Sequence, residues 1–168
     1  VYLIFTNEEN FFGFSEKNVD RKRPEKSKKY PHELDWKLTR VMINLIGLQE
    51  GETVCDPFCG TGTTLLESES MGINAIGIDF DEKMCEISKE NLRINNYKSK
   101  ILKSDFQELV KISKDFDGIV TDLPYGRSSK ASEKPEEILK KFIAIIPKHK
   151  KIAIMYKKEL DPKMKLKG

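Results

Sequence analysis

The fold is decided by the stretch Thr53-Val54-Cys55-Asp56-Pro57-Phe58-Cys59-Gly60-Thr61-Gly62-Thr63-Thr64-Leu65-Leu66-Glu67. This pattern is typical of a short buried strand, a tight glycine turn and the first turns of a helix. Gly60 and Gly62 allow the backbone to turn sharply and leave space for a ligand to lie against it. The helix that follows presents free N–H groups at its start. Such a unit is the usual cradle for a nucleotide-like cofactor at the carboxyl edge of a parallel sheet.

Two features of this loop distinguish between candidate cofactors. A dinucleotide fold requires G-x-G-x-x-G, but Leu65 stands in place of the third glycine. Asp56 brings a carboxylate into the turn, which would repel a pyrophosphate but suits a ligand that carries an ammonium and a sulfonium group. The loop therefore favours S-adenosylmethionine (SAM), with an ordinary strand–helix turn as the alternative. The expected cofactor contacts in this loop are Asp56, Phe58, Cys59, Gly60 and Gly62.

Length and composition indicate one globular domain. The chain has 168 residues, which is enough for a single core. No run approaches membrane-spanning length, and no secretory signal opens the chain. The three cysteines fit a reducing cytoplasm better than a disulfide framework. Because His32 and His149 supply no second ligand pair for Cys55 and Cys59, we expect no metal site.

Basic residues gather in two clusters, although the net charge is only +3. Six of the nine residues from Arg21 to Lys29 are basic, and the stretch from Lys148 to Lys167 carries eight lysines. Such clusters fit a polyanionic partner, and a solvated lysine-rich surface explains them equally well. We expect contacts with nucleic acid from Arg21, Lys22 and Arg23.

Hydrophobic periodicity predicts strands that alternate with helices. A hairpin is expected at residues 1–6 and 11–14, followed by a basic loop to residue 29 and a helix at 34–45 capped by Asp35. Parallel strands are expected around residues 54–55, 75–79, 101–106, 116–122 and 151–156. Helices are expected after the glycine loop to residue 71, after residue 80, and from Pro135. The alternation predicts an α/β, Rossmann-like fold with a mostly parallel sheet and helices on both faces.

Three of these strands end in an acidic residue, namely Asp79, Asp105 or Asp122. In an open parallel sheet such ends line one crevice. Asp79 is placed to accept hydrogen bonds from both ribose hydroxyls of an adenosine, and Asp105 from the adenine amino group. Phe80 and Phe106 follow directly and are expected to sandwich the ring. For each acid alone, a solvated loop position or a helix N-cap is the alternative.

The third acid begins the tight turn Asp122-Leu123-Pro124-Tyr125, which we expect to be catalytic. Pro124 fixes its own φ and biases Leu123 toward an extended backbone. The exocyclic amine of a base is a poor nucleophile because its lone pair is conjugated with the ring. The Asp122 carboxylate and a backbone carbonyl would bind its two hydrogens and aim the lone pair at the methyl group of SAM. Tyr125 would stack on a flipped base.

These motifs resemble class I SAM-dependent methyltransferases, and in particular the archaeal tRNA guanine-N2 methyltransferase family, which modifies guanosine at position ten. The likeness rests on residues 56–62, on Asp79 and Asp105, on the turn at 122–125, and on Gly126-Arg127-Ser128-Ser129. It implies that Arg127 contacts RNA. It also implies that residues 30–168 form the methyltransferase domain, with residues 1–29 as part of it or as a linker.

The chain departs from the family pattern in three places. Leu123 replaces the first proline of the usual D-P-P-Y motif. The family normally carries an N-terminal THUMP domain for tRNA capture, so we expect a missing domain or a partner subunit to supply that function. The final antiparallel pair of strands is also expected to be missing, because residues 157–168 are few and polar.

The leading hypothesis is therefore a cytoplasmic enzyme that methylates the N2 amine of guanosine in tRNA. A DNA adenine-N6 or cytosine-N4 methyltransferase is the first alternative, since its loop and its D-P-P-Y turn are very similar. A non-catalytic RNA-binding subunit with the same fold is the second, although an intact Asp122 argues against it. A nicotinamide-dependent dehydrogenase is opposed by Asp56 and by the missing third glycine.

Overall fold

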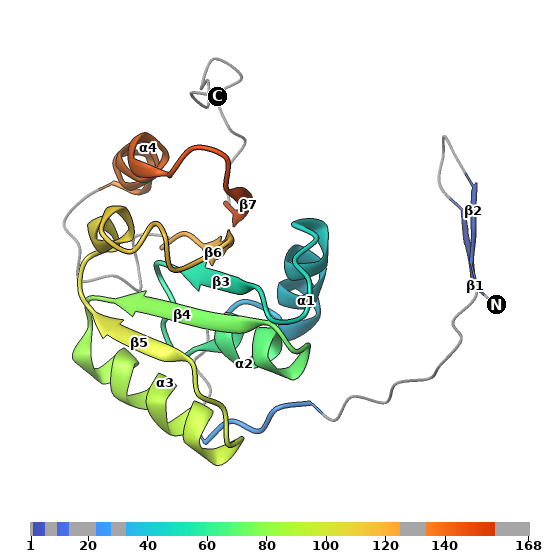
Figure 1. Ribbon diagram of the computed structural model, residues 1–168, viewed down its shortest axis with the longest axis horizontal. Coiled ribbons are helices and arrows are strands. Elements are labelled where there is room, and N and C mark those ends of the chain that lie inside the picture. The colour runs from blue at the N-terminus through green and yellow to red at the C-terminus, as the bar shows by residue number, and fades with distance from the viewer. Residues whose placement is uncertain (1, 6–9, 14–22, 28–32, 125–133, 157–168) are drawn as a thin grey trace.

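The computed structural model describes residues 2–5, 10–13, 23–27, 33–124 and 134–156 (Figure 1). Near the N-terminus, β1 (Tyr2–Phe5) pairs antiparallel with β2 (Asn10–Gly13). The predicted hairpin is therefore confirmed, and each boundary lies one residue from the expected position. Residues 125–133, which include the Gly126-Arg127-Ser128-Ser129 stretch, lie outside the described residues. So do residues 157–168, on which the prediction of missing antiparallel strands depends.

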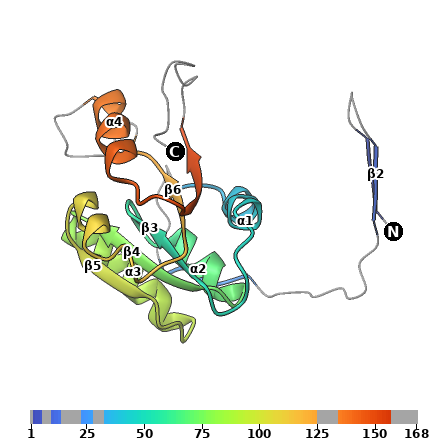
Figure 2. The ribbon, with the colours of Figure 1, turned by 45° about the horizontal axis from the view of Figure 1, so that its top comes forward.

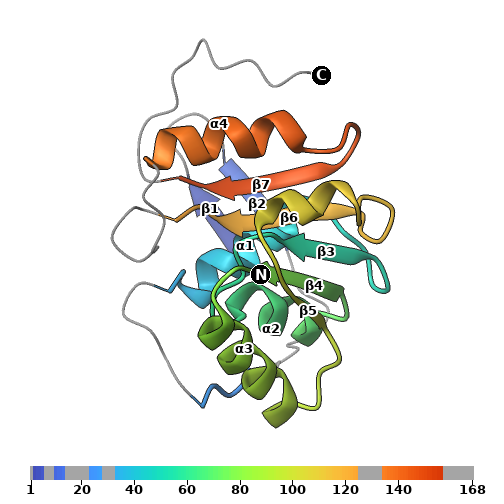
Figure 3. The same ribbon diagram turned by 90° about the vertical axis from the view of Figure 1, so that its left-hand side faces the viewer.

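A five-stranded parallel sheet forms the body of the protein. Its strands are β3 (Thr53–Asp56), β4 (Asn74–Asp79), β5 (Lys100–Lys103), β6 (Gly118–Asp122) and β7 (Lys151–Met155). They lie in the order β5-β4-β3-β6-β7, as Figure 3 shows. The chain moves outward from β3 to β5 and then returns to the other side of β3. Ligands of open parallel sheets bind at such a reversal of strand order, outside the carboxyl ends.

Helices cover both faces of this sheet, which confirms the predicted fold class. One face carries α1 (Trp36–Leu45), α2 (Thr63–Ser70) and α3 (Glu82–Ile94). The other carries α4 (Pro135–Ile145) and a 3-10 helix, η1 (Phe106–Val110). Figure 2 shows α1 and α4 on opposite sides of β6 and β7. No helix in the described ranges has the length and apolar character needed to cross a lipid bilayer.

Two apolar cores result from the alternation of side chains along the strands. Val54 lies in the core beneath α1 and α2, and its neighbour Cys55 lies in the core beneath α4. On β6, Val120 lies in the core beneath α1 and α2, and Ile119 lies in the core beneath α4. Because both faces of the central strands are buried, their sequences are almost continuously apolar.

Local capping explains where most of the helices begin. The Asp35 side chain accepts hydrogen bonds from the backbone N–H groups of Lys37 and Leu38, which confirms the predicted cap of α1. Pro135 occupies the first turn of α4, where its missing N–H costs nothing. The helix η1 was not expected from the sequence. Its first residues were assigned to the end of a strand, and Asp105 proves to be its N-cap.

The glycine loop and α2 lie directly against the backbone of β4 at Gly77. A Cβ atom at this position would lie 2.8 Å from Cys59 Sγ and 2.9 Å from Leu65 Cδ2. Both neighbours are buried, with 6% and 0% of their surface exposed. The absence of a side chain at Gly77 therefore allows the loop to approach the sheet closely.

Gly77→Ala should lower the free energy of unfolding by about 1–3 kcal/mol, because the added methyl group overpacks this contact. Chemical denaturation measures the change. Lys100→Ala, at an exposed position on β5, is the control and should change the stability by less than about 0.5 kcal/mol. Equal stabilities for Gly77→Ala and the wild type would show that the loop can move away from β4 without cost.

Candidate functional site

Acidic residues occupy the carboxyl ends of four neighbouring strands. In spatial order, Asp105 follows β5, Asp79 ends β4, Asp56 ends β3 and Asp122 ends β6. All four strands are parallel, so the structure brings these residues to one edge of the sheet. Carboxylates gathered in this way must find hydrogen-bond donors or cations, because burying an unpaired charge is costly.

The glycine loop lies over this edge and is held by backbone hydrogen bonds. The N–H of Cys59 donates to the carbonyl of Ile78 at 3.0 Å, and the N–H of Gly62 donates to the carbonyl of Cys59 at 2.8 Å. Gly60 and Gly62 have φ values of 50° and 84°, in the region that favours glycine. A Cβ at Gly62 would clash with Ser88 on α3, whereas a Cβ at Gly60 would meet nothing within 4 Å. The loop therefore packs on the protein at Gly62 and is open at Gly60.

Both oxygens of Asp79 accept hydrogen bonds from backbone groups. Its Oδ2 accepts from the N–H of Gly60 and its Oδ1 from the N–H of Asp81, each at 2.8 Å. Burial raises the pKa of Asp79, and these two bonds oppose that rise. Asp81, not Asp79, is the N-cap of α3, so the helix-cap alternative for Asp79 is wrong. The carboxylate is thus oriented before any ligand arrives.

Asp105 is a helix N-cap, which the sequence analysis gave as the alternative to a contact with the cofactor. Its side chain accepts a hydrogen bond from the N–H of Gln107 at 3.0 Å and caps η1. The residue is exposed at the edge of the site. An additional contact with an adenine amino group stays a prediction.

Asp56 is the most deeply buried of the four acids, with 3% of its surface exposed. Its Oδ1 accepts hydrogen bonds from the N–H of Phe58 at 3.1 Å and from Thr121 Oγ1 at 2.7 Å. Burial raises the pKa of Asp56 to about 6; bonds from Thr64, Thr121 and Phe58 oppose the rise, and the charge of Asp122 adds to it. The bond to Thr121 connects the end of β3 with the end of β6.

The aromatic residues expected near a ligand differ in their surroundings. Phe58 and Phe106 have ring centroids 5.1 Å apart, and both contact Phe142 of α4 edge-on. Phe106 is 9% exposed and belongs to the core, whereas Phe80 is 47% exposed. The sandwich of an adenine ring between Phe80 and Phe106 stays a prediction.

The turn after β6 is anchored by Leu123. This residue is 1% exposed, and its N–H donates to the carbonyl of Met155 on β7 at 3.2 Å. A proline has no N–H, so the more usual Pro-Pro sequence could not form this bond. Asp122 and Pro124 on either side are half-buried, and Tyr125 lies outside the described residues.

Of the four residues expected to bind RNA, only Arg23 is described. Arg21, Lys22 and Arg127 lie outside the described residues. The Arg23 guanidinium carbon lies 5.2 Å from the ring centroid of Trp36, and Arg40 lies at the same distance. Lys37 Nζ lies 5.6 Å from the same centroid, and Arg23 and Lys37 are both exposed to solvent.

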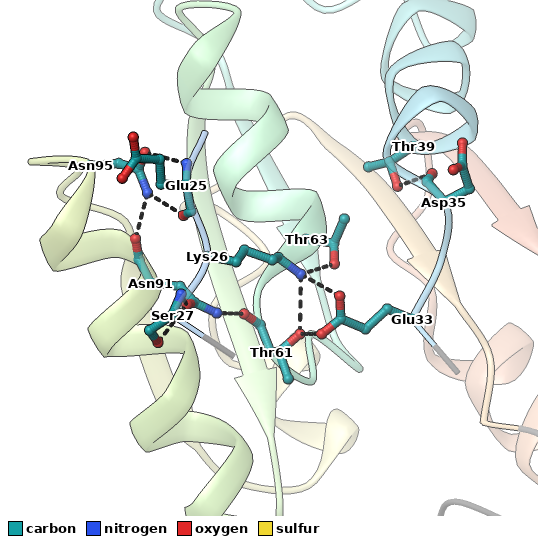
Figure 4. Close-up of polar contacts among 10 residues, drawn as sticks. All are labelled: Glu25, Lys26, Ser27, Glu33, Asp35, Thr39, Thr61, Thr63, Asn91 and Asn95. Carbon is teal, nitrogen blue, oxygen red and sulfur yellow. Dashed lines mark hydrogen bonds and ion pairs between the residues drawn. The ribbon is translucent and has the colours of Figure 1, made fainter. Parts of the chain in front are cut away.

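Lys26 and Glu33 contact the glycine loop, although neither was expected there. Lys26 lies within the basic stretch that was interpreted as a loop with RNA contacts. Its ammonium reaches Thr61 and Thr63 instead (Figure 4). Nothing local in the sequence marks either residue, because the contact joins segments about 35 residues apart.

The three buried cysteines have unreactive thiol groups. Cys55, Cys59 and Cys85 are free, and burial raises the pKa of each thiol. They therefore stay protonated at neutral pH and serve as small apolar side chains. The described part of the chain holds no group of three or more His, Cys, Asp or Glu residues suited to a metal ion.

Comparison with known proteins connects this geometry to a family. The model of the family described as "RMKL-like, methyltransferase domain" matches residues 23–164. The chain is 39% identical over 134 residues to the tRNA (guanine(10)-N2)-dimethyltransferase of Methanothermobacter thermautotrophicus, covering 77% of the chain and 39% of that relative. It is 36% identical over 141 residues to the enzyme of the same name from Methanocaldococcus jannaschii, covering 79% and 40%. The chain thus spans about two fifths of the length of these relatives.

A solved structure shows the same fold. TrmN from Thermus thermophilus superposes with a TM-score of 0.55 at 24% identity, over 68% of this chain and 36% of the other. The parallel sheet and its helices are therefore an arrangement already known from experiment.

The raised pKa of Asp56 predicts a pH-dependent stability. The folded state binds the proton more tightly than the unfolded state, so the free energy of unfolding should fall as pH rises from about 4 to about 6. Asp56→Asn retains an oxygen for Phe58 and Thr121 but does not titrate. Its stability relative to the wild type should grow by about 2–3 kcal/mol across this range, as urea denaturation at successive pH values would measure.

Asp115→Asn, at an exposed position before β6, is the control. Its free energy of unfolding relative to the wild type should not change between pH 4 and pH 6. If the difference between Asp56→Asn and the wild type is constant from pH 4 to 7, the pKa of Asp56 is not raised.

Proposed function

Because the chain belongs to the family of RMKL-like methyltransferase domains, we propose that it transfers a methyl group from SAM to the exocyclic N2 amine of guanosine in tRNA. The two archaeal relatives carry the names of enzymes with this substrate, which supports tRNA over DNA. The chain spans about two fifths of their length. The activity proposed is therefore that of the protein to which this domain belongs.

The residues of the strand-end edge fit SAM. Gly60 has open space where a side chain would be, so a ligand can approach the backbone of the loop. Asp79 is held by two backbone N–H groups, and its remaining lone pairs can accept from the ribose hydroxyls. Asp56 and its neighbouring acids suit a ligand with positive charge and disfavour a pyrophosphate. SAM, when bound, supplies an electrophilic methyl group.

Asp122 is the proposed catalytic residue. Its carboxylate, together with a backbone carbonyl of the turn at 122–125, accepts hydrogen bonds from the two hydrogens of the guanosine amine. These bonds direct the nitrogen lone pair at the methyl group and stabilise the positive charge that develops on the nitrogen. Tyr125 stacks on the base after it leaves its helix.

The observation that carries this proposal is the hydrogen bond between Thr121 and Asp56. Thr121 Oγ1 lies 2.7 Å from Asp56 Oδ1, and both residues are buried. Thr121 directly precedes Asp122 in the chain. The hydrogen bond therefore holds the turn that begins at Asp122 next to the glycine loop, on the neighbouring strand. A methyl donor over the loop and an amine at the turn would be adjacent.

The proposal extends to the N-terminal segment, the RNA contacts and the capture of tRNA. Residues 1–29 serve as part of the domain or as a linker to it. Arg21, Lys22, Arg23 and Arg127 contact the RNA backbone, and a THUMP domain or a partner subunit captures the tRNA. The protein works in the cytoplasm, where its substrate resides.

Labelled SAM offered with bulk tRNA and with duplex DNA tests the substrate class. We expect label in tRNA, and mass spectrometry of the digested nucleosides should place the methyl group on N2 of guanosine. Label on adenine or cytosine of DNA would support the first alternative. A protein that binds RNA but neither binds SAM nor transfers methyl would support the non-catalytic alternative.

Asp122→Ala should lower methyl transfer at least about 100-fold, because it removes one of the two acceptors that orient the amine. Binding of S-adenosylhomocysteine (SAH), the demethylated product, should be nearly unchanged in isothermal titration. Asp115→Ala is the matched control, since this exposed acid precedes β6 at the opposite edge of the sheet. Wild-type transfer rates in Asp122→Ala would remove Asp122 from the catalytic role.

A further inference from the structure

A polar network joins the segment before α1 to the glycine loop. Lys26 Nζ donates to Glu33 Oε2 at 2.7 Å, to Thr63 Oγ1 at 2.6 Å and to Thr61 Oγ1 at 3.3 Å. Thr61 Oγ1 in turn donates to Glu33 Oε1 at 2.5 Å. Figure 4 shows the ammonium between the two threonines and the carboxylate. Lys26 and Glu33 thus hold the side chains on both sides of Gly62.

A second set of bonds fixes the same loop from α3. Asn91 is fully buried, and its Nδ2 donates to the carbonyl of Thr61 at 2.9 Å. Its Oδ1 accepts from the N–H and the hydroxyl of Ser27 at 2.9 and 3.0 Å. Asn95, one turn later, bonds both the N–H and the carbonyl of Glu25. Glu25 and Ser27 are therefore attached to the C-terminal end of α3, and Asn91 contacts both Ser27 and the loop.

Among the described residues, the Lys26–Glu33 and Arg40–Glu67 ion pairs are largely buried, and the Lys26–Glu33 pair is the one that contacts the glycine loop. The side chain of Lys26 is 4% exposed and that of Glu33 is 17% exposed. The ammonium also lies at the start of α2, where the helix dipole is positive and disfavours a cation. A buried ion pair commonly adds little stability, because desolvation offsets the attraction between the charges. A role in shaping the loop explains its presence better than a role in stability.

The other bonds described above hold the backbone of the loop, through Ile78, Asp79 and Asn91. Gly60 and Gly62 have no side chains and adopt left-handed backbone conformations, which cost conformational entropy to fix. The hydroxyl groups of Thr61 and Thr63, on either side of Gly62, are the side-chain groups by which another segment can hold this stretch. Lys26 contacts both of them.

We propose that Lys26 and Glu33 are positioning residues that hold the glycine loop in its ligand-binding shape and so set the affinity for SAM. The inference rests on the proposed function, since it takes SAM as the ligand of the loop. A loop ordered in advance loses less entropy when its ligand binds, and affinity rises accordingly. Lys26 and Glu33 are thus part of the cofactor site, although both precede the first strand of the parallel sheet.

The test is isothermal titration of the full chain with SAH, which needs no RNA. Lys26→Met alone would remove the cation that contacts the part-buried Glu33 carboxylate, so the variant is Lys26→Met combined with Glu33→Gln. We expect the Kd for SAH to rise about tenfold or more. The KM for SAM should rise similarly, whereas kcat at saturating SAM should stay within about threefold, because the catalytic turn is untouched.

Lys103→Met is the matched control. Lys103 and Glu82 also form a 2.7 Å ion pair, but both side chains are more than half exposed. This variant should bind SAH as the wild type does. A second pair of variants covers the case in which the double variant does not fold. Thr63→Val removes the hydroxyl that Lys26 contacts and should weaken SAH binding, and Thr63→Ser retains the hydroxyl and should restore it.

Two outcomes would overturn the proposal, and they are distinguishable. If the wild type binds SAH and the folded Lys26→Met/Glu33→Gln or Thr63→Val variant binds it equally well, the network is structural only. If the wild type binds no SAH, the assignment of SAM itself fails, and the positioning role fails with it. A lower melting temperature with unchanged SAH affinity belongs to the first outcome.

Discussion

Four neighbouring parallel strands end at or shortly before an acidic residue, and this imposes one constraint on the fold, which is that several carboxylates share the same side of the sheet. Each must be supplied with donors by its own surroundings, and the structure does so differently for each. Asp79 receives two backbone N–H groups, Asp105 caps a 3-10 helix, and Asp56 is buried against a threonine of the next strand. The edge remains negative, and so it is suited to a ligand that brings positive charge or hydroxyl donors.

The sheet and its helices could be predicted because their signals are local and repeated. Apolar runs marked the strands, Asp35 and Pro135 marked helix starts, and the glycine loop marked the centre of the sheet. Family resemblance agreed with this pattern, and the family model and the curated relatives confirm it. The helix η1 was missed because it is a single short element after a strand, where Asp105 and Phe106 fit either interpretation.

The site was only partly predictable, because sequence patterns indicate residue types at strand ends but not their hydrogen bonds. Asp56 was expected to face a ligand, and the structure adds a buried bond to Thr121 that no spacing rule reveals. The contacts of Lys26 and Glu33 with the glycine loop were not predicted, for a related reason. A lysine in a basic stretch has the composition of a solvated surface, and its burial depends on the distant threonines that it contacts.

The bond between Leu123 and the carbonyl of Met155 has a mechanical consequence. Met155 is the last residue of β7, and β7 is the outermost strand on that side of the sheet. The backbone that begins the turn after Asp122 is thereby attached to the outermost strand, in addition to the bond that joins Thr121 to Asp56 on the central strand β3. The edge strand is thus joined to β6 along its whole length, from Gly118 to Asp122 and on to Leu123, so the position of the turn depends on how β7 is seated.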